Sequence, residues 1–214
     1  MQGESVPNDQ IAHRISPGLL LRLVTRPNAV FAELAESEPS AADVFFRLSL
    51  WLVALPPLFA FIGTRTYGWR LGAAEPLLLP PAAVAAISLG YFLALVGGFI
   101  TTALIARWMS WTYGARHSLG IHFAVITVVG APLAIGSLAH LYPDVFINVL
   151  VLVPVLIWSM YLLYKGLPVA LRISPQQGML MASSLIGYML VSAVSLLGIT
   201  VFCWVHGLGP DLGF

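Results

Sequence analysis

The 214-residue sequence is poor in charge and has a single cysteine, and both shortages narrow what the protein can be. Only 9% of its residues are charged, whereas about a quarter of a soluble domain is charged. A chain of this size therefore lacks the charge to cover a surface in contact with water. The single Cys203 excludes an intrachain disulfide and any cysteine-rich metal or redox motif.

Recognisable catalytic and ion-binding patterns are also missing from the sequence. It contains no GxSxG, no HExxH and no phosphate-binding loop. His122 and His140 would lie about 27 Å apart on one helix, too far to share a metal ion. Apart from Arg47, no charged residue falls inside an expected span, and ion-coupled carriers usually keep one there. We therefore expect no enzymatic activity, no cofactor and no metal.

Long apolar segments dominate what is present, because 59% of the residues are hydrophobic. A helix needs about 20 apolar residues to cross a bilayer, and the chain has several such segments. They cover approximately residues 44–62, 82–106, 119–141, 145–164 and 179–205. The sequence predicts an all-α fold, a polytopic membrane helical bundle with five transmembrane helices in one domain, 44–206. A short outer tail, 207–214, would follow it.

A short amphipathic helix is predicted in the N-terminal segment, 1–43. Its leucines, interrupted by Arg22 and Arg26, form an apolar run that is too short to span the membrane. This helix could lie in the membrane interface, or its leucines could pack on the ends of the transmembrane helices, and the two arrangements are compatible. Ser40 and Asp43 resemble a capping box at the start of the first span.

Small residues and prolines mark the expected contacts between spans. Gly90, Ala94 and Gly98 recur every four residues and leave a strip of bare backbone on the second span. Another helix, or a ligand or lipid, can approach such a strip closely. The fifth span carries a similar row with Ser183 and Gly187. Prolines inside the spans remove backbone donors and predict kinks at Pro56, Pro57, Pro132 and Pro154.

The basic residues predict the orientation of the chain. With the N-terminus inside, eight arginine and lysine residues fall on the cytoplasmic side, and only Arg65 and Arg70 fall outside. Cytoplasmic loops are enriched in such residues. The first residues also lack the continuous apolar run of a secretory signal. We expect a cytoplasmic N-terminus and a C-terminus on the outer side.

The end of the fourth span carries the most distinctive cluster. Tyr161 and Tyr164 have amphipathic rings that suit the lipid headgroup level. Gly166 and Pro168 are expected to stop the helix just beyond them. Together with Leu167, these residues form either a cytoplasmic docking surface or an interfacial anchor.

The order of these features resembles the Yip1-domain family, particularly its bacterial branch. The resemblance rests on the segment LLLRLVTRPNAVFAELAE, the five spans and the run WSMYLLYKGLPVALRISPQQG. The positions that match the family's aromatic-to-Gly-Leu pattern are Trp158, Tyr161, Tyr164, Gly166 and Leu167. The DLYGP-type segment of eukaryotic members is not in the sequence, so Rab-GTPase binding does not carry over.

The resemblance implies a non-enzymatic multi-pass protein of the bacterial inner membrane that binds membrane proteins or shapes membranes. Its expected partners are membrane lipids and other integral membrane proteins or a second copy of the chain, and not nucleic acid. The main hypothesis is therefore a scaffold, an accessory subunit or a membrane-organising factor. Prolines in the first, third and fourth spans favour an alternative, a channel or carrier for a small neutral solute or lipid.

Overall fold

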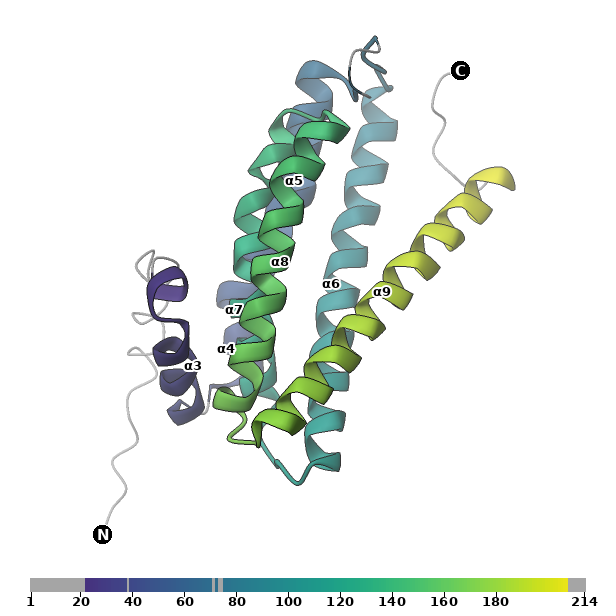
Figure 1. The fold of residues 1–214 in the computed structure, drawn as a ribbon. Coiled ribbons are helices and arrows are strands. Elements are labelled where there is room, and N and C mark those ends of the chain that lie inside the picture. The colour runs from purple at the N-terminus through teal and green to yellow at the C-terminus, as the bar shows by residue number, and fades with distance from the viewer. Residues whose placement is uncertain (1–21, 38, 71, 73–74, 208–214) are drawn as a thin grey trace.

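Helices make up the framework of the computed structural model, which describes residues 22–37, 39–70, 72 and 75–207. The elements follow the chain in this order: α3 (Pro27–Glu36), α4 (Ala41–Val44), the π-helix η1 (Phe45–Ser49), α5 (Leu50–Tyr67), α6 (Pro81–Thr112), α7 (Leu119–Gly136), the 3₁₀-helix η2 (Ser137–Leu141), α8 (Val145–Ala170) and α9 (Pro175–Val205). Five continuous helical stretches are long and apolar enough to cross a membrane: Ala41–Tyr67, Pro81–Thr112, Leu119–Leu141, Val145–Ala170 and Pro175–Val205. The predicted all-α, five-span fold is confirmed (Figure 1).

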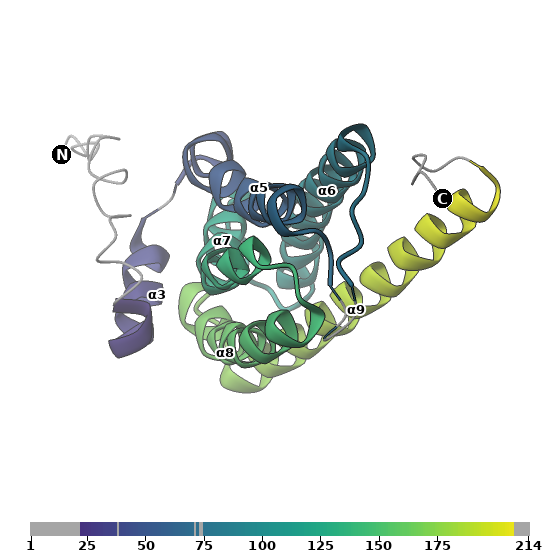
Figure 2. The same ribbon diagram turned by 90° about the horizontal axis from the view of Figure 1, so that it is seen from above.

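Helix α7 lies at the centre of the bundle, between α5, α6 and α8 (Figure 2). In the most apolar 18 residues of the span that contains α7, 61% of the residues are buried. In the corresponding parts of the other four spans, 11% or fewer are buried. Small side chains such as Ala124, Ala131 and Ala134 keep α7 thin enough for neighbours on several sides. The four outer helices therefore present most of their apolar surface to lipid.

Helix α9 touches the bundle only along its first half. Met181, Ala182 and Leu185 are buried, and the Tyr188 hydroxyl donates to Thr101 Oγ1 of α6 at 2.7 Å. From Ala193 to Val205 every residue except Cys203 is exposed. Both views show this half slanting away from α6 (Figures 1 and 2).

The fourth span is longer than the sequence indicated. Helix α8 continues through Gly166 and Pro168 to Ala170, so the expectation that these two residues stop the helix is wrong. A proline removes one backbone donor, and tertiary packing can hold a helix together across that loss. The turn that ends α8 comes later, where Arg172 adopts a left-handed backbone with φ 50°.

The capping box expected at Ser40 is also absent, because the Ser40 side chain makes no capping hydrogen bond in the structure. A complete capping box forms instead at the start of α9. There Ser174 Oγ accepts from the Gln177 backbone N–H at 3.3 Å, and Gln177 Oε1 accepts from the Ser174 N–H at 3.1 Å. Helix α9 therefore begins at a well-defined residue.

The prolines at the predicted kinks all lie inside continuous helices. Pro56 and Pro57 of α5 are buried against neighbouring elements. Pro132 of α7 is half-buried and Pro154 of α8 is exposed. The kinks themselves stay a prediction.

Candidate functional site

Helix α3 packs on the end of α8 through one phenylalanine. The Phe31 side chain is fully buried, and it lies directly over Gly166. A Cβ atom built on Gly166 would overlap three carbon atoms of the Phe31 ring. Gly166 thus leaves a hollow in the surface of α8 that receives an aromatic ring.

Apolar side chains from three parts of the chain surround this contact. Leu23 and Val30 reach it from the N-terminal segment and are at most 2% exposed. Its buried members on or just after α8 are Leu162, Leu163, Leu167, Ala170 and Leu171, those on α9 are Met181, Ala182 and Leu185, and the cluster continues into α6 and α7 through Ala106, Ile121, Val125, Val128 and Val129. We call this cluster, together with Phe31 and Gly166, the α3–α8–α9 junction. Of the two arrangements for the N-terminal leucines, Leu23 adopts the one in which it packs on the membrane helices, and Leu19, Leu20 and Leu21 lie outside the described residues.

Pro168 connects the same segment of α8 to α9. A Cβ atom on Gly178 would lie 2.8 Å from the Pro168 ring, so the two helices meet there at close range. Gly166 faces α3, Leu167 is buried in the shared core and Pro168 faces α9. Three successive residues of α8 therefore each contribute a different part of the junction.

The two tyrosines at this end of α8 have different surroundings. The Tyr164 hydroxyl lies 2.9 Å from Ser183 Oγ on α9 and ties the two helices together. Tyr161 stacks on Trp158, with ring centroids 5.1 Å apart, and remains 41% exposed. Tyr161 thus faces outward, and whether it serves as an anchor or as a docking surface stays a prediction.

Polar groups hold the edge of the junction. Arg22 forms an ion pair with Glu33 of α3. The hydrogen bond that its guanidinium donates to the Glu33 carboxylate raises the pKa of Arg22 above its usual value. His117 Nε2 donates to the Leu171 carbonyl at 2.8 Å and so satisfies an acceptor left free where α8 ends. Lys165 and Arg172 are exposed beside these contacts.

The small-residue strip on α6 has no close neighbour within the described chain. Cβ atoms built on Gly90 and Gly98 meet no other residue within 4 Å, and the same holds for Gly187 on α9. Ala94 lies between the two α6 glycines and is half-buried. Ser183, four residues before Gly187 on α9, lies beside the junction, since its Oγ is 2.9 Å from the Tyr164 hydroxyl.

Two glycines that sequence reasoning missed mark the tightest contacts between backbones. A Cβ on Gly63 of α5 would overlap the His140 carbonyl oxygen of η2, and a Cβ on Gly120 of α7 would overlap the Pro39 carbonyl oxygen. Gly63 has no small residue four positions away, whereas Gly120 and Ala124 form a short four-residue pair of small residues. Because the contact is with backbone that is distant in sequence, such a pair marks a face of α7 but not the segment that lies against it.

The histidines lie in separate places. His122 is 1% exposed between the Ser118 carbonyl, 2.8 Å from Nδ1, and Ser110 Oγ, 3.0 Å from Nε2. His140 lies near Asn148 at the opposite end of α7. Within the described residues no group of three histidine, cysteine or acidic side chains could hold a metal ion. The arrangement around the α3–α8–α9 junction is suited to packing and docking.

These features define an integral membrane protein of five apolar helices, with an N-terminal helix packed on the end of the bundle. The chain belongs to the Yip1 domain family, whose model matches residues 21–196. It is similar to the inner membrane protein YohC of Escherichia coli K12, with 31% identity over 158 residues, 74% of this chain and 81% of the relative. YohC of Escherichia coli O6:H1 matches with the same identity and coverage. No solved structure matches the chain.

Proposed function

We propose that the protein is a non-enzymatic scaffold or accessory subunit that organises other proteins in the membrane through helix contacts. The observation that carries this proposal is the strip on α6 that the described residues leave uncovered, where a Cβ atom added to Gly90 or Gly98 would meet none of their atoms within 4 Å. Small residues on a lipid-facing helix allow another helix to come close enough for extensive van der Waals contact. The strip is therefore suited to a helix of another integral membrane protein or of a second copy of the chain.

The position of the strip follows from the helix period. At about 100° per residue, Gly97 and Thr101 lie within roughly 20° of Gly90 around α6. Thr101 accepts the hydrogen bond from Tyr188, so this face of α6 points toward α9. Because α9 slants away beyond Tyr188, the face above Thr101 is left uncovered (Figure 1).

We further propose that the protein lies in the inner membrane of a bacterium with its N-terminus in the cytoplasm. Among the described residues, Arg65 and Arg70 lie at the end of the bundle that holds the α5–α6 loop. The end that holds α3 carries most of the others, including Arg116, Lys165 and Arg172. The excess of basic residues beside α3 supports a cytoplasmic location for that end.

Purification of the whole protein in a mild detergent, with variants of the α6 strip, tests the scaffold function. Replacing both Gly90 and Gly98 by leucine adds bulk where the chain leaves room, so the fold should persist while partner binding falls at least tenfold. Ala85→Leu is the control, because Ala85 is exposed about 140° away around α6.

The expected result is a stoichiometric partner or a defined homo-oligomer for the unchanged protein and for Ala85→Leu. A monomer that recovers no partner from native membranes would overturn the proposal. Flux of a small neutral solute into liposomes that hold the purified protein alone would favour the channel or carrier instead.

A further inference from the structure

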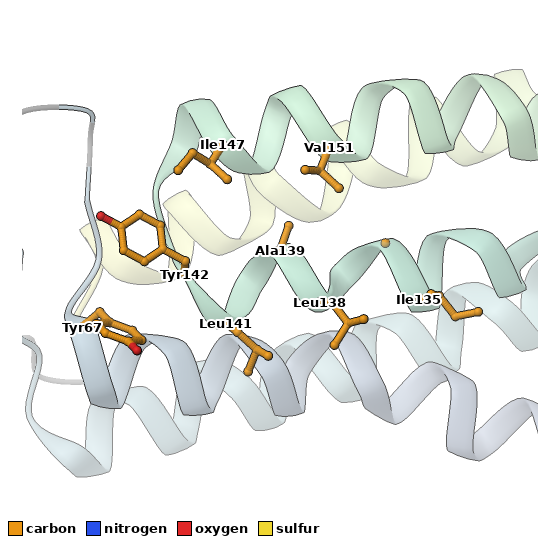
Figure 3. A pocket seen from close by; sticks show the side chains of 9 residues that line it. Tyr67, Ile135, Leu138, Ala139, Leu141, Tyr142, Ile147 and Val151 are labelled. Atoms are coloured by element: carbon orange, nitrogen blue, oxygen red, sulfur yellow. The ribbon is translucent and has the colours of Figure 1, made fainter.

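An open groove runs along the bundle at the end opposite α3. Helix η2 forms its floor, with α5 on one side and α8 on the other (Figure 3). Its volume is about 550 Å³. Leu138 and Ala139 line the floor, and Ile147 and Val151 line the α8 side. Because this part of the chain belongs to apolar membrane helices, the groove faces lipid.

Two aromatic rings close the groove at the end of the bundle. The ring centroids of Tyr67 and Tyr142 lie 5.7 Å apart, and both residues line the groove (Figure 3). Tyrosine is enriched at the headgroup level of membranes, where one part of its ring is apolar and its hydroxyl is wet. The groove is thus apolar near Val151 and becomes polar at its mouth, near Tyr67.

Arg70 holds a positive charge at this mouth. Its guanidinium carbon lies 5.7 Å from the centre of the Tyr142 ring, and Nη1 donates to the Tyr142 hydroxyl at 3.4 Å. The Arg70 backbone is fixed on both sides, since its N–H donates to the Pro143 carbonyl at 2.9 Å and its carbonyl accepts from Val145 N at 3.2 Å. The charge is therefore held in place by the fold and does not depend on a flexible loop.

No carboxylate forms an ion pair with Arg70 in the part of the chain that the structure describes, although Asp144 is its backbone bridge partner. No acidic oxygen lies within 4.0 Å of the Arg70 guanidinium, and Nε is shielded without a hydrogen-bond partner. Asp144 is close in sequence to the turn, but its Oδ1 accepts from Phe146 N and Ile147 N at 3.0 and 3.1 Å. Among the described residues the mouth thus presents a guanidinium that forms no ion pair, beside an apolar groove.

We propose that this groove binds one anionic phospholipid, with an acyl chain along η2 and the headgroup phosphate at Arg70. The apolar floor matches the chain, and the guanidinium, a fork of donors, matches phosphate oxygens. A headgroup that also carries an amine brings a positive charge close to Arg70 and binds less well. The site lies on η2, α5 and α8 and does not involve the α6 strip. Lipid binding here would therefore be a function additional to the proposed scaffold function.

Native mass spectrometry of the whole protein in detergent, with added lipid, tests the proposal. The probes are dioleoyl phosphatidylglycerol and dioleoyl phosphatidylcholine, which share acyl chains and differ in net headgroup charge. The unchanged protein should bind the phosphatidylglycerol more tightly, and Arg70→Gln should weaken that binding about tenfold, the effect of losing one charge-assisted hydrogen bond. Arg65→Gln is the control, because Arg65 lies in the last turn of α5 at the same end of the bundle but, unlike Arg70, forms no hydrogen bond or cation–π contact with Tyr142 of the groove.

A second pair of variants tests the acyl-chain position. Ala139→Phe fills the floor of the groove and should reduce the binding of both lipids, whereas Ala85→Phe adds the same ring on exposed α6 and should not. Equal affinity of the unchanged protein for the two lipids would overturn the proposal. So would an Arg70→Gln variant that keeps the preference, or an Arg65→Gln variant that loses it equally. The α6 variants leave this site intact, so failure of one proposal is separable from failure of the other.

Discussion

Phe31→Ala is the change that most directly tests how α3 is held on the membrane bundle. The side chain is fully buried and its ring fills the hollow over Gly166. Truncating a buried phenylalanine to alanine typically costs about 3–5 kcal/mol, because apolar contacts are lost and a cavity remains. Only Leu23 and Val30 of the described N-terminal segment are buried as deeply, so little else replaces the lost contact. We expect α3 to detach while the five membrane helices stay folded.

The size of the effect follows from the same free energy. A loss of about 3 kcal/mol corresponds to roughly a hundredfold larger population in which α3 is open, at about 1.4 kcal/mol per factor of ten. Hydrogen–deuterium exchange of the whole protein in detergent, read by mass spectrometry, reports that population for the amides of Pro27–Glu36. Amides of α7 should keep their protection, because α7 lies at the centre of the bundle.

Two further variants separate a specific contact from general damage. Phe202→Ala removes an exposed ring on the free half of α9 and should leave exchange in α3 unchanged. Gly166→Ala places a methyl group against the Phe31 ring and should destabilise α3 in the unchanged protein. In the Phe31→Ala background the same methyl group meets a cavity, so its cost should fall, and the two changes should not be additive. Unchanged exchange in α3 after Phe31→Ala would refute the reasoning, as would additive effects of the two changes.

Two other predictions compare positions that look alike in sequence. Gly63→Ala should lower the free energy of unfolding in detergent by about 1–3 kcal/mol, because its methyl group would meet backbone. Gly90→Ala should raise the free energy of unfolding by up to about 1 kcal/mol, because the described residues leave that site open. Equal effects of the two changes in thermal unfolding would contradict this prediction. Ser174→Ala should raise amide exchange in the first turn of α9 by roughly fivefold, for a cap worth about 1 kcal/mol. Ser40→Ala should change the exchange of α4 little, since Ser40 makes no capping hydrogen bond, and a Ser174→Ala variant that exchanged like the unchanged protein would contradict the cap's role.

The α3–α8–α9 junction gives a physical meaning to the Gly-Leu-Pro run near the end of α8. Gly166 has no side chain and so leaves room for the Phe31 ring. Leu167 fills part of the buried core, and Pro168 contacts α9 at Gly178. A substitution in this run is therefore expected to change how α3 and α9 pack on α8. The run couples the N-terminal segment to the last helix through three adjacent residues.

Composition and apolar length predict the class of protein and the number of spans. Apolar length and low charge are sums over many residues, so a single misjudged position does not change them. Family membership could be predicted for a different reason. The aromatic residues and the Gly-Leu pair near Tyr164 form a local motif that is visible in the sequence. The end of α8 was the least secure boundary, because whether a helix continues past Gly166 and Pro168 depends on what packs against it.

Which small residues are covered and which are bare depends on how the helices pack against one another. The four-residue spacing of Gly90 and Gly98 shows that they share a face of α6, but it cannot show whether a neighbour lies there, and within the described chain none does. Gly63 has no small residue four positions away and Gly120 has only Ala124, yet carbonyl oxygens from distant segments lie directly against both glycines. Two helices approach closely only if both of the facing surfaces allow it. The spacing of small residues along one helix describes only one of these two surfaces. For that reason the junction at Gly166 and the mouth at Arg70 became visible only when helices far apart in sequence were brought together.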